Sequence, residues 1–413
     1  MHCKSQSLFR AIWGAATAAL LLIALALVLS HTQTAHAQTF QVLHTLTGAD
    51  GSWPASWLTL DAAGNLYGTA AVTRNDPYCD DIERFSPACG TLFKLSSEGF
   101  TVLHTFAGHV AVLGDGSYPL DSGVIFGPDG GLYGTTQLGG LPGGAGAGTV
   151  YEYLAPREKV LYRFQGYPEF PSGPLVFDPA GNLYGTTPSW GFGTVFMLTP
   201  SDEGWMESVI YTFYGGGAPF GGVIFDNAGN LYGATNIGGG TGCDNGCGAI
   251  FELSPSPSGW TYQTLYDFHG GSDGGKPFGG LIFDRSGNLY GTTTAAGPAN
   301  AGTVFELSPS NGTWTFSVLY SLNGTGQAGT GPTASLVMDG AGNLFGTAPG
   351  AGVYGLGSAF KLMPSDGGWT YTSLHDFAGG RDGALPYGGV ILDAEGNLYG
   401  AAAAGSVIYK ITP

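Results

Sequence analysis

The densest group of chemically capable side chains lies within residues 69–89. The candidate ligand-binding residues in this segment are Arg74, Asp76, Tyr78, Asp80 and Asp81. Several converging carboxylate oxygens can bind Ca²⁺, but the spacing here does not match an EF-hand loop. Long loops on a rigid scaffold often carry recognition. The segment therefore predicts either a recognition loop or an acidic, solvated loop. We expect no cofactor, and Ca²⁺ is the one ion that these carboxylates would suit.

A second group of candidates surrounds an Asp-Gly-x-x-Pro pattern, which occurs at residues 50–54, 115–119 and 382–386 and in a varied form at 273–277. Asp-Gly pairs favour turns. The candidate ligand-binding residues near this pattern, or in a neighbouring loop, are Trp53, Tyr118, Trp190, Arg381 and Tyr387. Together with Trp57, Phe220 and Phe278, the aromatic members would form stacking surfaces for a sugar or peptide, or pack as core in the mouth of a ring.

No residue is assigned a catalytic or metal-binding role. A glycoside hydrolase needs two carboxyl groups at a fixed separation, one of them protonated. The carboxylates that we considered show no spacing that selects a pair: Asp80, Glu83, Asp244 and Asp382. The arginines available for an anionic sugar are Arg74, Arg157 and Arg381. We expect no Gly-x-Ser-x-Gly nucleophile elbow, no His-Glu-x-x-His motif and no phosphate-binding loop.

The first 37 residues predict an export signal. Lys4 and Arg10 give a basic start, residues 11–30 are uncharged and largely apolar, and Ala35-His36-Ala37 fits a small-x-small cleavage site. We expect cleavage after Ala37, and the alternative is an uncleaved anchor, because the apolar run is long enough to span a bilayer. Both outcomes place residues 38–413 outside the cytoplasm, in the periplasm, in the medium or at the cell surface.

The remaining cysteines fit an oxidising compartment. Besides Cys3 in the leader there are four, an even number. Cys79 and Cys89 bracket the end of the long acidic segment, and Cys243 and Cys247 bracket a corresponding loop. We expect two local disulfides, Cys79–Cys89 and Cys243–Cys247. Zinc is the alternative, although no histidine or second cysteine pair lies near either pair in sequence.

Net charge restricts the partners. The chain carries −17 at pH 7 with only 13 lysines and arginines and no basic stripe. We expect no sequence-independent nucleic-acid binding, because such binding depends on neutralising phosphates. An acidic surface also disfavours anionic lipid, so we expect no membrane contact after leader cleavage.

The candidate loops connect the strands of a repeated unit. An apolar run, an Asp-x-x-Gly-Asn turn and a Leu-Tyr-Gly run recur, and the Gly-x-Leu-aromatic-Gly core begins at Gly64, Gly130, Gly181, Gly229, Gly287, Gly342 and Gly396. Two further β-rich runs follow in each unit, so each unit is predicted to hold four strands. Four-stranded units repeated around a ring predict an all-β fold, a single seven-bladed β-propeller.

A count of strands predicts how the ring closes. The last unit ends at Pro413 without a fourth strand, while residues 40–46 match residues 100–106. The N-terminal strand is therefore expected to complete the last blade, which leaves no free edge there. The predicted domains are a signal peptide at 1–37 and one propeller at 38–413. The predicted blades are 57–106, 122–164, 174–213, 221–268, 279–322, 334–377, and 388–413 with 40–46.

Antiparallel neighbours place the Asp-x-x-Gly-Asn turns on one face of the ring and the loops after each second and fourth strand on the other. The turn carboxylates Asp178, Asp226, Asp284 and Asp393 are interpreted as structural, since each turn offers one carboxylate where Ca²⁺ needs several oxygens. His44, His104 and His375 alternate with tyrosines at one position of the fourth strand, which predicts a half-buried polar tip. Function is expected on the loop face, where the units differ.

The units resemble the GloVer (Gloeo/Verruco) tandem repeat over nearly all of residues 40–413. The resemblance rests on Gly-Val-Ile-Phe-Asp-x-x-Gly-Asn-Leu-Tyr-Gly, followed by Gly-Thr-Val-Phe-Glu-Leu-Ser-Pro and Leu-Tyr-x-Phe. It implies an exported bacterial protein, secreted or on the surface, and it implies no activity or site. Similar proteins often end in a C-terminal sorting anchor. None follows Pro413, which favours secretion into the periplasm or medium.

We therefore expect a monomeric, extracytoplasmic propeller that acts as a non-enzymatic binding or scaffold module through its loop face. Its expected partner is an extracellular glycan or a surface protein. The alternative is an extracellular carbohydrate-active enzyme, a glycosidase or lyase, with a site at the ring axis. A deep axial pocket with charged groups from unlike blades would favour the enzyme, and a plugged axis with a shallow rim would favour binding.

The disulfide prediction is tested by thiol labelling. The mature, denatured protein is expected to show no free thiol when it is labelled without reductant, and all four after reduction. Four free thiols before reduction would exclude both disulfides.

Overall fold

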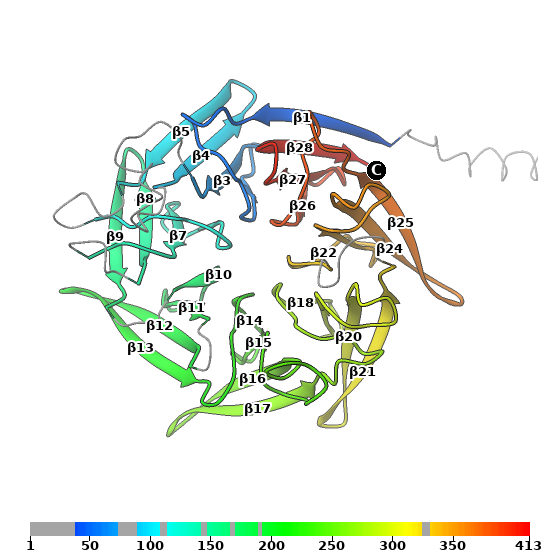
Figure 1. Cartoon of the computed structure of the whole chain (residues 1–413). Coiled ribbons are helices and arrows are strands. Elements are labelled where there is room, and N and C mark those ends of the chain that lie inside the picture. Colours follow the sequence, from blue (N-terminus) through cyan, green and yellow to red (C-terminus); the bar gives the residue numbers. More distant parts are fainter. Residues whose placement is uncertain are drawn as a thin grey trace, which may run out of the picture. The chain divides into compact units, whose positions relative to one another are not determined.

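The computed structural model describes residues 38–72, 89–107, 114–141, 147–165, 170–188, 192–323 and 331–413. Every regular element in this part of the chain is a β-strand. The strands form seven four-stranded antiparallel sheets within the compact unit Phe40–Thr412. In Figure 1 the sheets are arranged as blades around a central axis. The all-β, seven-bladed propeller predicted from the repeat is confirmed. The predicted export signal lies outside the described residues, and no described helix is long and apolar enough to cross a membrane.

Each blade has its first strand nearest the axis and its fourth at the rim (Figure 1). The first strands are β2 (Thr59–Leu60), β6 (Val124–Phe126), β10 (Ser172–Phe177), β14 (Val223–Phe225), β18 (Ile282–Phe283), β22 (Val337–Met338) and β26 (Val390–Leu392). The second strands are β3 (Leu66–Ala70), β7 (Leu132–Thr136), β11 (Leu183–Thr187), β15 (Leu231–Thr235), β19 (Leu289–Thr292), β23 (Leu344–Ala348) and β27 (Leu398–Ala402).

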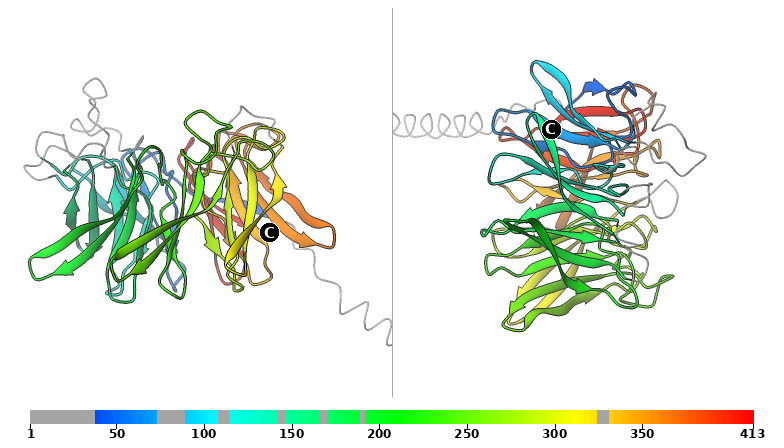
Figure 2. Two further views of the ribbon diagram at one scale, coloured as in Figure 1. Left: turned by 90° about the horizontal axis from the view of Figure 1, so that it is seen from below. Right: turned by 90° about the vertical axis from the view of Figure 1, so that its left-hand side faces the viewer.

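The third and fourth strands are longer. The third strands are β4 (Thr91–Ser96), β8 (Thr149–Leu154), β12 (Thr194–Ser201), β16 (Ala249–Ser256), β20 (Thr303–Ser310), β24 (Ser358–Ser365) and β28 (Val407–Thr412). The fourth strands are β5 (Gly99–Thr105), β9 (Arg157–Arg163), β13 (Gly204–Thr212), β17 (Gly259–Asp267), β21 (Thr313–Ser321), β25 (Gly368–Asp376) and β1 (Thr39–Thr45). The turns and loops that join them lie at the two faces of the ring, which Figure 2 shows edge-on.

The repeated Leu-Tyr-Gly run is explained by packing. In β11 a Cβ atom on Gly185 would lie 2.5 Å from the ring of Phe196 and 2.8 Å from Leu175. Phe196 is fully buried in the next strand of the same blade. Glycine is required there because the aromatic ring occupies the space of a side chain. The repeat is therefore a signature of the blade core.

The Asp-x-x-Gly-Asn turn is held by its own aspartate. Asp226 accepts hydrogen bonds from the backbone N–H groups of Ala228 (2.8 Å) and Asn230 (2.9 Å), from the Asn230 amide (2.8 Å) and from the Tyr232 hydroxyl (3.2 Å). Gly229 has a φ of 88°, which suits glycine. Burial acts to raise the pKa of Asp226, but these hydrogen bonds prevail and lower it. The carboxylate is thus fully used by the turn, as interpreted from the sequence.

The N-terminal strand closes the ring. The last sheet has the order β1-β28-β27-β26, and the Leu46 N–H donates to the Ser406 carbonyl at 2.8 Å. Phe40 in β1 stacks on His375 of the preceding blade, with ring centroids 3.7 Å apart. The predicted completion of the last blade by residues 40–46 is confirmed.

The stacking of Phe40 on His375 is one case of a contact that recurs between neighbouring fourth strands. We call each such contact a seam. Four other seams also pair two rings: His44–Phe100 (4.1 Å), Tyr211–Tyr262 (4.5 Å), Tyr266–Phe316 (3.9 Å) and Tyr320–Tyr371 (4.9 Å). At the two seams of β9 a glutamate replaces the second ring. Glu207 accepts a hydrogen bond from Tyr162 at 2.7 Å, and Glu158 faces His104. The His/Tyr position that was predicted to be a half-buried polar tip therefore supplies one side chain of every seam.

The closing seam yields a stability prediction. Phe40→Ala removes the ring that stacks on His375 and contacts Phe377 and Tyr409. The variant should lose about 2–3 kcal/mol of unfolding free energy, less than a fully buried phenylalanine because Phe40 is partly exposed. Val42→Ala in the same strand, where the side chain is exposed, should lose less than about 1 kcal/mol. Equal losses in a urea titration would contradict closure through this ring.

Candidate functional site

Four of the connections from fourth to first strands present one side chain at an equivalent place. In the Asp-Gly-x-x-Pro pattern the residue before proline is Trp53, Tyr118, Lys276 or Leu385, and its φ is 58–59° in all four. Left-handed backbone is uncommon for residues other than glycine. We call these four residues the pre-proline positions. Their shared conformation with unlike side chains makes them the clearest candidates for recognition.

Backbone hydrogen bonds hold the pre-proline positions. The Lys276 N–H donates to the Cys247 carbonyl at 2.6 Å, and the Lys276 carbonyl accepts from the Thr294 N–H at 3.2 Å. Leu385 is bonded in the same way to Leu356 (2.8 Å) and Ala403 (3.1 Å). Each position therefore bridges the loop of one blade to the residues just after the second strand of the next. Because the backbone alone makes these bonds, the side chain is free to differ.

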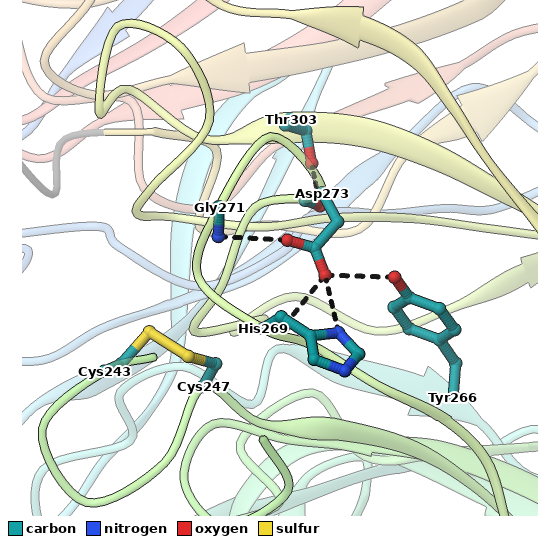
Figure 3. A network of polar contacts seen from close by, with 7 residues as sticks. All are labelled: Cys243, Cys247, Tyr266, His269, Gly271, Asp273 and Thr303. Carbon is teal, nitrogen blue, oxygen red and sulfur yellow. Dashed lines mark hydrogen bonds and ion pairs between the residues drawn. A yellow bond between two sulfur atoms is a disulfide. The ribbon is translucent and has the colours of Figure 1, made fainter. Parts of the chain in front are cut away.

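The aspartate of the same pattern is a structural anchor. In Figure 3, Asp273 accepts hydrogen bonds from the Tyr266 hydroxyl (3.0 Å), the Gly271 N–H (3.1 Å) and the His269 N–H (2.8 Å), while its carbonyl accepts from Thr303 Oγ1 (3.2 Å). The corresponding pairs elsewhere are His44–Asp50 (3.0 Å), His104–Asp115 (2.7 Å) and His375–Asp382 (3.2 Å). Asp382, considered as a hydrolase carboxylate, is committed to this role.

The segment in Figure 3 also matches Gly-x-Ser-x-Gly at residues 270–274. Ser272 is exposed in a turn between β17 and β18. A nucleophile elbow requires a sharp strand-to-helix turn, and no helix follows here. The match carries no catalytic assignment.

A cavity of about 540 Å³ lies on the ring axis. Its lining comes from connections on several sides of the ring, which places it near the centre: Trp53, Ala55, Trp57, Leu120, Asp121, Asn236, Lys276, Phe278, Thr294, Ala295, Thr333 and Tyr387. The pre-proline residues Trp53 and Lys276 are among them. Aromatic faces and a few hydroxyl, amide and charged groups therefore share one concave space, as in many small-molecule sites.

Asp121 brings a carboxyl group to this cavity because its blade has one extra residue. Four residues separate Pro119 from Val124, whereas three separate the matching residues at 54–58, 219–223, 277–281, 332–336 and 386–390. The φ of Asp121 is 58°. Burial raises the pKa of Asp121 to about 6, and the Gln137 amide acts in the opposite direction. Asp121 was not predicted from the sequence, although its insertion into the repeat was a detectable signal.

Lys276 provides the opposite charge. Its ammonium donates to the Asp244 carbonyl at 2.6 Å, and burial lowers its pKa while nearby Asp244 acts to raise it. Asp244 sits inside the loop closed by the Cys243–Cys247 disulfide, which is confirmed. The disulfide thus fixes the carbonyl that holds Lys276. Cys89 is also disulfide-bonded, and Cys79, its predicted partner, lies outside the described residues.

A second cavity of about 460 Å³ adjoins the first at Trp53. It lies where blade 7 meets blade 1 and is lined by Leu46, Thr47, Gly48, Ser52, Trp53, Val72, Tyr118 and residues 403–406. Trp53 lines both cavities and is 37% exposed, so its indole forms a shared wall. The Trp53 and Tyr387 rings are 6.4 Å apart. The pKa of Tyr118 is raised by burial and by the nearby Asp121 carboxylate.

The structure separates the residues proposed from sequence into three groups. Trp53, Tyr118 and Tyr387 line the two adjoining cavities. Arg381 is exposed and lines neither. Arg74, Asp76, Tyr78, Asp80, Asp81 and Trp190 lie outside the described residues. Trp57, Phe278 and Asn236 join the axial cavity together with Asp121 and Lys276.

Comparisons with known proteins agree on the fold. The model of a family described as the Gloeobacter/Verrucomicrobia repeat matches residues 82–282 and 241–413. No curated protein matches the sequence. Virginiamycin B lyase from Staphylococcus aureus is similar in structure with a TM-score of 0.56, at 14% identity, over 91% of this chain and 100% of the lyase chain.

Two larger proteins contain a similar ring. PorZ, a surface component of the type-IX secretion system of Porphyromonas gingivalis, gives a TM-score of 0.52 at 14% identity over 88% of this chain and 47% of its own. The extracellular domain of a one-component system from B. thetaiotaomicron gives a TM-score of 0.52 at 12% identity, over 90% of this chain and 39% of its own. At these identities the similarity concerns the fold alone.

The Asp121 carboxyl yields a pH prediction. Because its pKa is raised from 3.8 to about 6, the folded protein favours the protonated form, and stability falls as pH rises through this interval. Asp121→Asn should raise the unfolding free energy by on the order of 1 kcal/mol above about pH 7 and leave it unchanged below about pH 4. Urea titrations at both pH values measure this. The control Asp366→Asn changes an exposed aspartate in the turn between β24 and β25. A pH-independent effect of Asp121→Asn would contradict the prediction.

Proposed function

This chain belongs to the Gloeobacter/Verrucomicrobia repeat family, and we propose that it is an extracytoplasmic binding protein that holds a short glycan in the two cavities at the mouth of its ring. The observation that carries the proposal is Trp53, an exposed indole that walls both cavities. The proposal also rests on the polar groups that surround it.

The lining suits a sugar better than a purely apolar ligand. Sugars present C–H faces that pack on aromatic rings, and hydroxyls that need hydrogen-bond partners. Trp53, Trp57 and Tyr387 supply rings in the axial cavity, and Asn236 and Thr333 supply an amide and a hydroxyl. The adjoining cavity is lined in part by glycines such as Gly48 and Gly405, which can offer backbone N–H and C=O groups to a ligand.

Two cavities that share one indole favour an oligosaccharide over a single sugar. A ligand that passes over Trp53 can contact both sides of the indole, with one sugar residue in each cavity. A monosaccharide fills only one. Longer neutral oligosaccharides should therefore bind more tightly than their monomers.

Binding is favoured over hydrolysis because the axial cavity holds one described carboxylate. Asp121 has a pKa near 6 and so has the proton affinity of a general acid. A glycosidase needs a second carboxyl group, and no other aspartate or glutamate lines either cavity among the described residues. An extracellular carbohydrate-active enzyme remains the second candidate because of this one titrating group.

Location outside the cytoplasm is supported by the Cys243–Cys247 disulfide, since such bonds persist in oxidising compartments. The disulfide also holds Lys276 at the cavity, so the compartment and the site are linked. Secretion and leader cleavage are part of this proposal.

The test is an array of neutral and acidic oligosaccharides, followed by calorimetry with the strongest hit and its monomer. Trp53→Ala should weaken binding at least about tenfold, or ~1.4 kcal/mol. Tyr214→Ala is the matched control, because Tyr214 is 81% exposed and lines neither cavity, and it should bind like the parent protein.

Three outcomes would overturn the proposal. They are an absence of binding across the array, equal losses in the two variants, and turnover detected by product analysis. Turnover that is lost in Asp121→Asn would establish the enzymatic alternative.

A further inference from the structure

One seam carries more than a structural contact. At the seam between blades 1 and 2, Glu158 occupies the place that Phe100, Tyr262, Phe316 and Tyr371 occupy in other blades, as the strand registers show. In those blades an aromatic ring covers the His or Tyr of the preceding blade. Here a carboxylate faces His104 instead. The substitution converts a packing contact into a group of polar donors.

Three donor atoms converge at this seam. His104 Nε2 lies 2.7 Å from Asp115 Oδ2, and a carboxylate oxygen of Glu158 completes a set whose members all lie within 4.8 Å of one another. Donors around a tetrahedral ion with bonds near 2.0–2.1 Å are about 3.3 Å apart. Binding therefore requires the His104–Asp115 pair to open from 2.7 Å toward that spacing. In the described part of the chain, no other group of three such residues meets this distance criterion.

The local charge favours a cation. Glu158 Oε1 is buried and has no hydrogen-bond partner, an arrangement that is costly for a carboxylate. Burial and then the neighbouring Asp115 raise the pKa of Glu158 to about 7, while His104 and Arg163 act in the opposite direction. The Tyr151 hydroxyl, also buried and without a partner, is close enough for Glu158 to affect its pKa. The Asp115 and Glu158 carboxylates thus share a confined space in which His104 and Arg163 only partly compensate their negative charge.

We propose that His104, Asp115 and Glu158 form a binding site for a divalent transition-metal ion of the Zn²⁺ type. One imidazole nitrogen and two carboxylate oxygens are ligands that Zn²⁺ accepts, with water in the fourth position. Ca²⁺ fits less well, because it prefers six to eight oxygens. The ion would replace the direct contact between His104 Nε2 and Asp115 Oδ2.

Other blades provide the internal comparison. The His44–Asp50 and His375–Asp382 pairs have the same histidine–aspartate geometry, but phenylalanine occupies the third place in both. These two pairs hold their loops without a third donor. Glu158 is therefore the residue that distinguishes a metal site from a structural pair.

The site also has a consequence for the mouth of the ring. Asp115 lies in the connection between β5 and β6, which also carries Tyr118 and Asp121, and these two residues line the cavities. An ion bound to Asp115 and Glu158 would link this connection to blade 2 at a point shortly before Tyr118 and Asp121 in the chain. Metal binding would therefore stiffen one wall of the cavities without contacting their contents.

The experiment is calorimetric titration of the chelator-treated, full-length mature protein with Zn²⁺ near pH 8, together with thermal unfolding with and without the ion. We expect one Zn²⁺ per chain and a metal-dependent rise in Tm. Glu158→Gln should weaken binding at least about tenfold and abolish the rise. Glu158→Phe restores the ring found in other blades, so it should fold stably and also lose the ion.

Glu207→Gln is the matched control, since it alters the glutamate of the neighbouring seam, which bonds Tyr162. This variant should bind Zn²⁺ like the parent protein. Absence of Zn²⁺ binding in the parent, or unchanged binding in both Glu158 variants, would overturn the proposal. A loss in Glu207→Gln equal to that in Glu158→Gln would overturn it as well, because the effect would then be one of general charge.

Discussion

The ring depends on the contact between each fourth strand and the next. A propeller blade has two faces that must be covered, and a ring covers all of them only when the last blade meets the first. The stacked pairs His44–Phe100 and Phe40–His375 flank the blade that combines both ends of the chain. The N-terminal strand therefore contributes through its rings as well as its backbone. Loss of one seam would expose two blade faces at once.

The seams also explain where variation is tolerated. A seam histidine that is hydrogen-bonded to a loop aspartate can have either an aromatic ring or a carboxylate beside it. His104 therefore faces Glu158, whereas His44 faces Phe100. The pre-proline positions follow the same logic at the mouth. Their backbones are held by equivalent hydrogen bonds, while the side chains range from Trp53 to Lys276. A rigid frame with free side chains can change its ligand without changing its fold.

Several features were predictable because they repeat. Seven copies of the Gly-x-Leu-aromatic-Gly core define seven blades, and the match of residues 40–46 to 100–106 defines closure. Trp53, Tyr118 and Tyr387 were selected because they stand beside Asp-Gly-x-x-Pro turns on the variable face. Asp121 was missed although its insertion into the repeat can be read from the sequence. Glu158 was missed because its departure from the repeat shows only when the strand register is known.

The sequence by itself determined the number of blades, the closing strand and the face that carries the variable loops, because these follow from local strand and turn chemistry summed over identical units. Only the tertiary structure decided which variable residues meet. Lys276 and Asp121 are far apart along the chain and come from unlike blades, and they share a cavity because the ring brings its connections to one axis. Distances between blades are set by packing across the seams, and no local pattern encodes them.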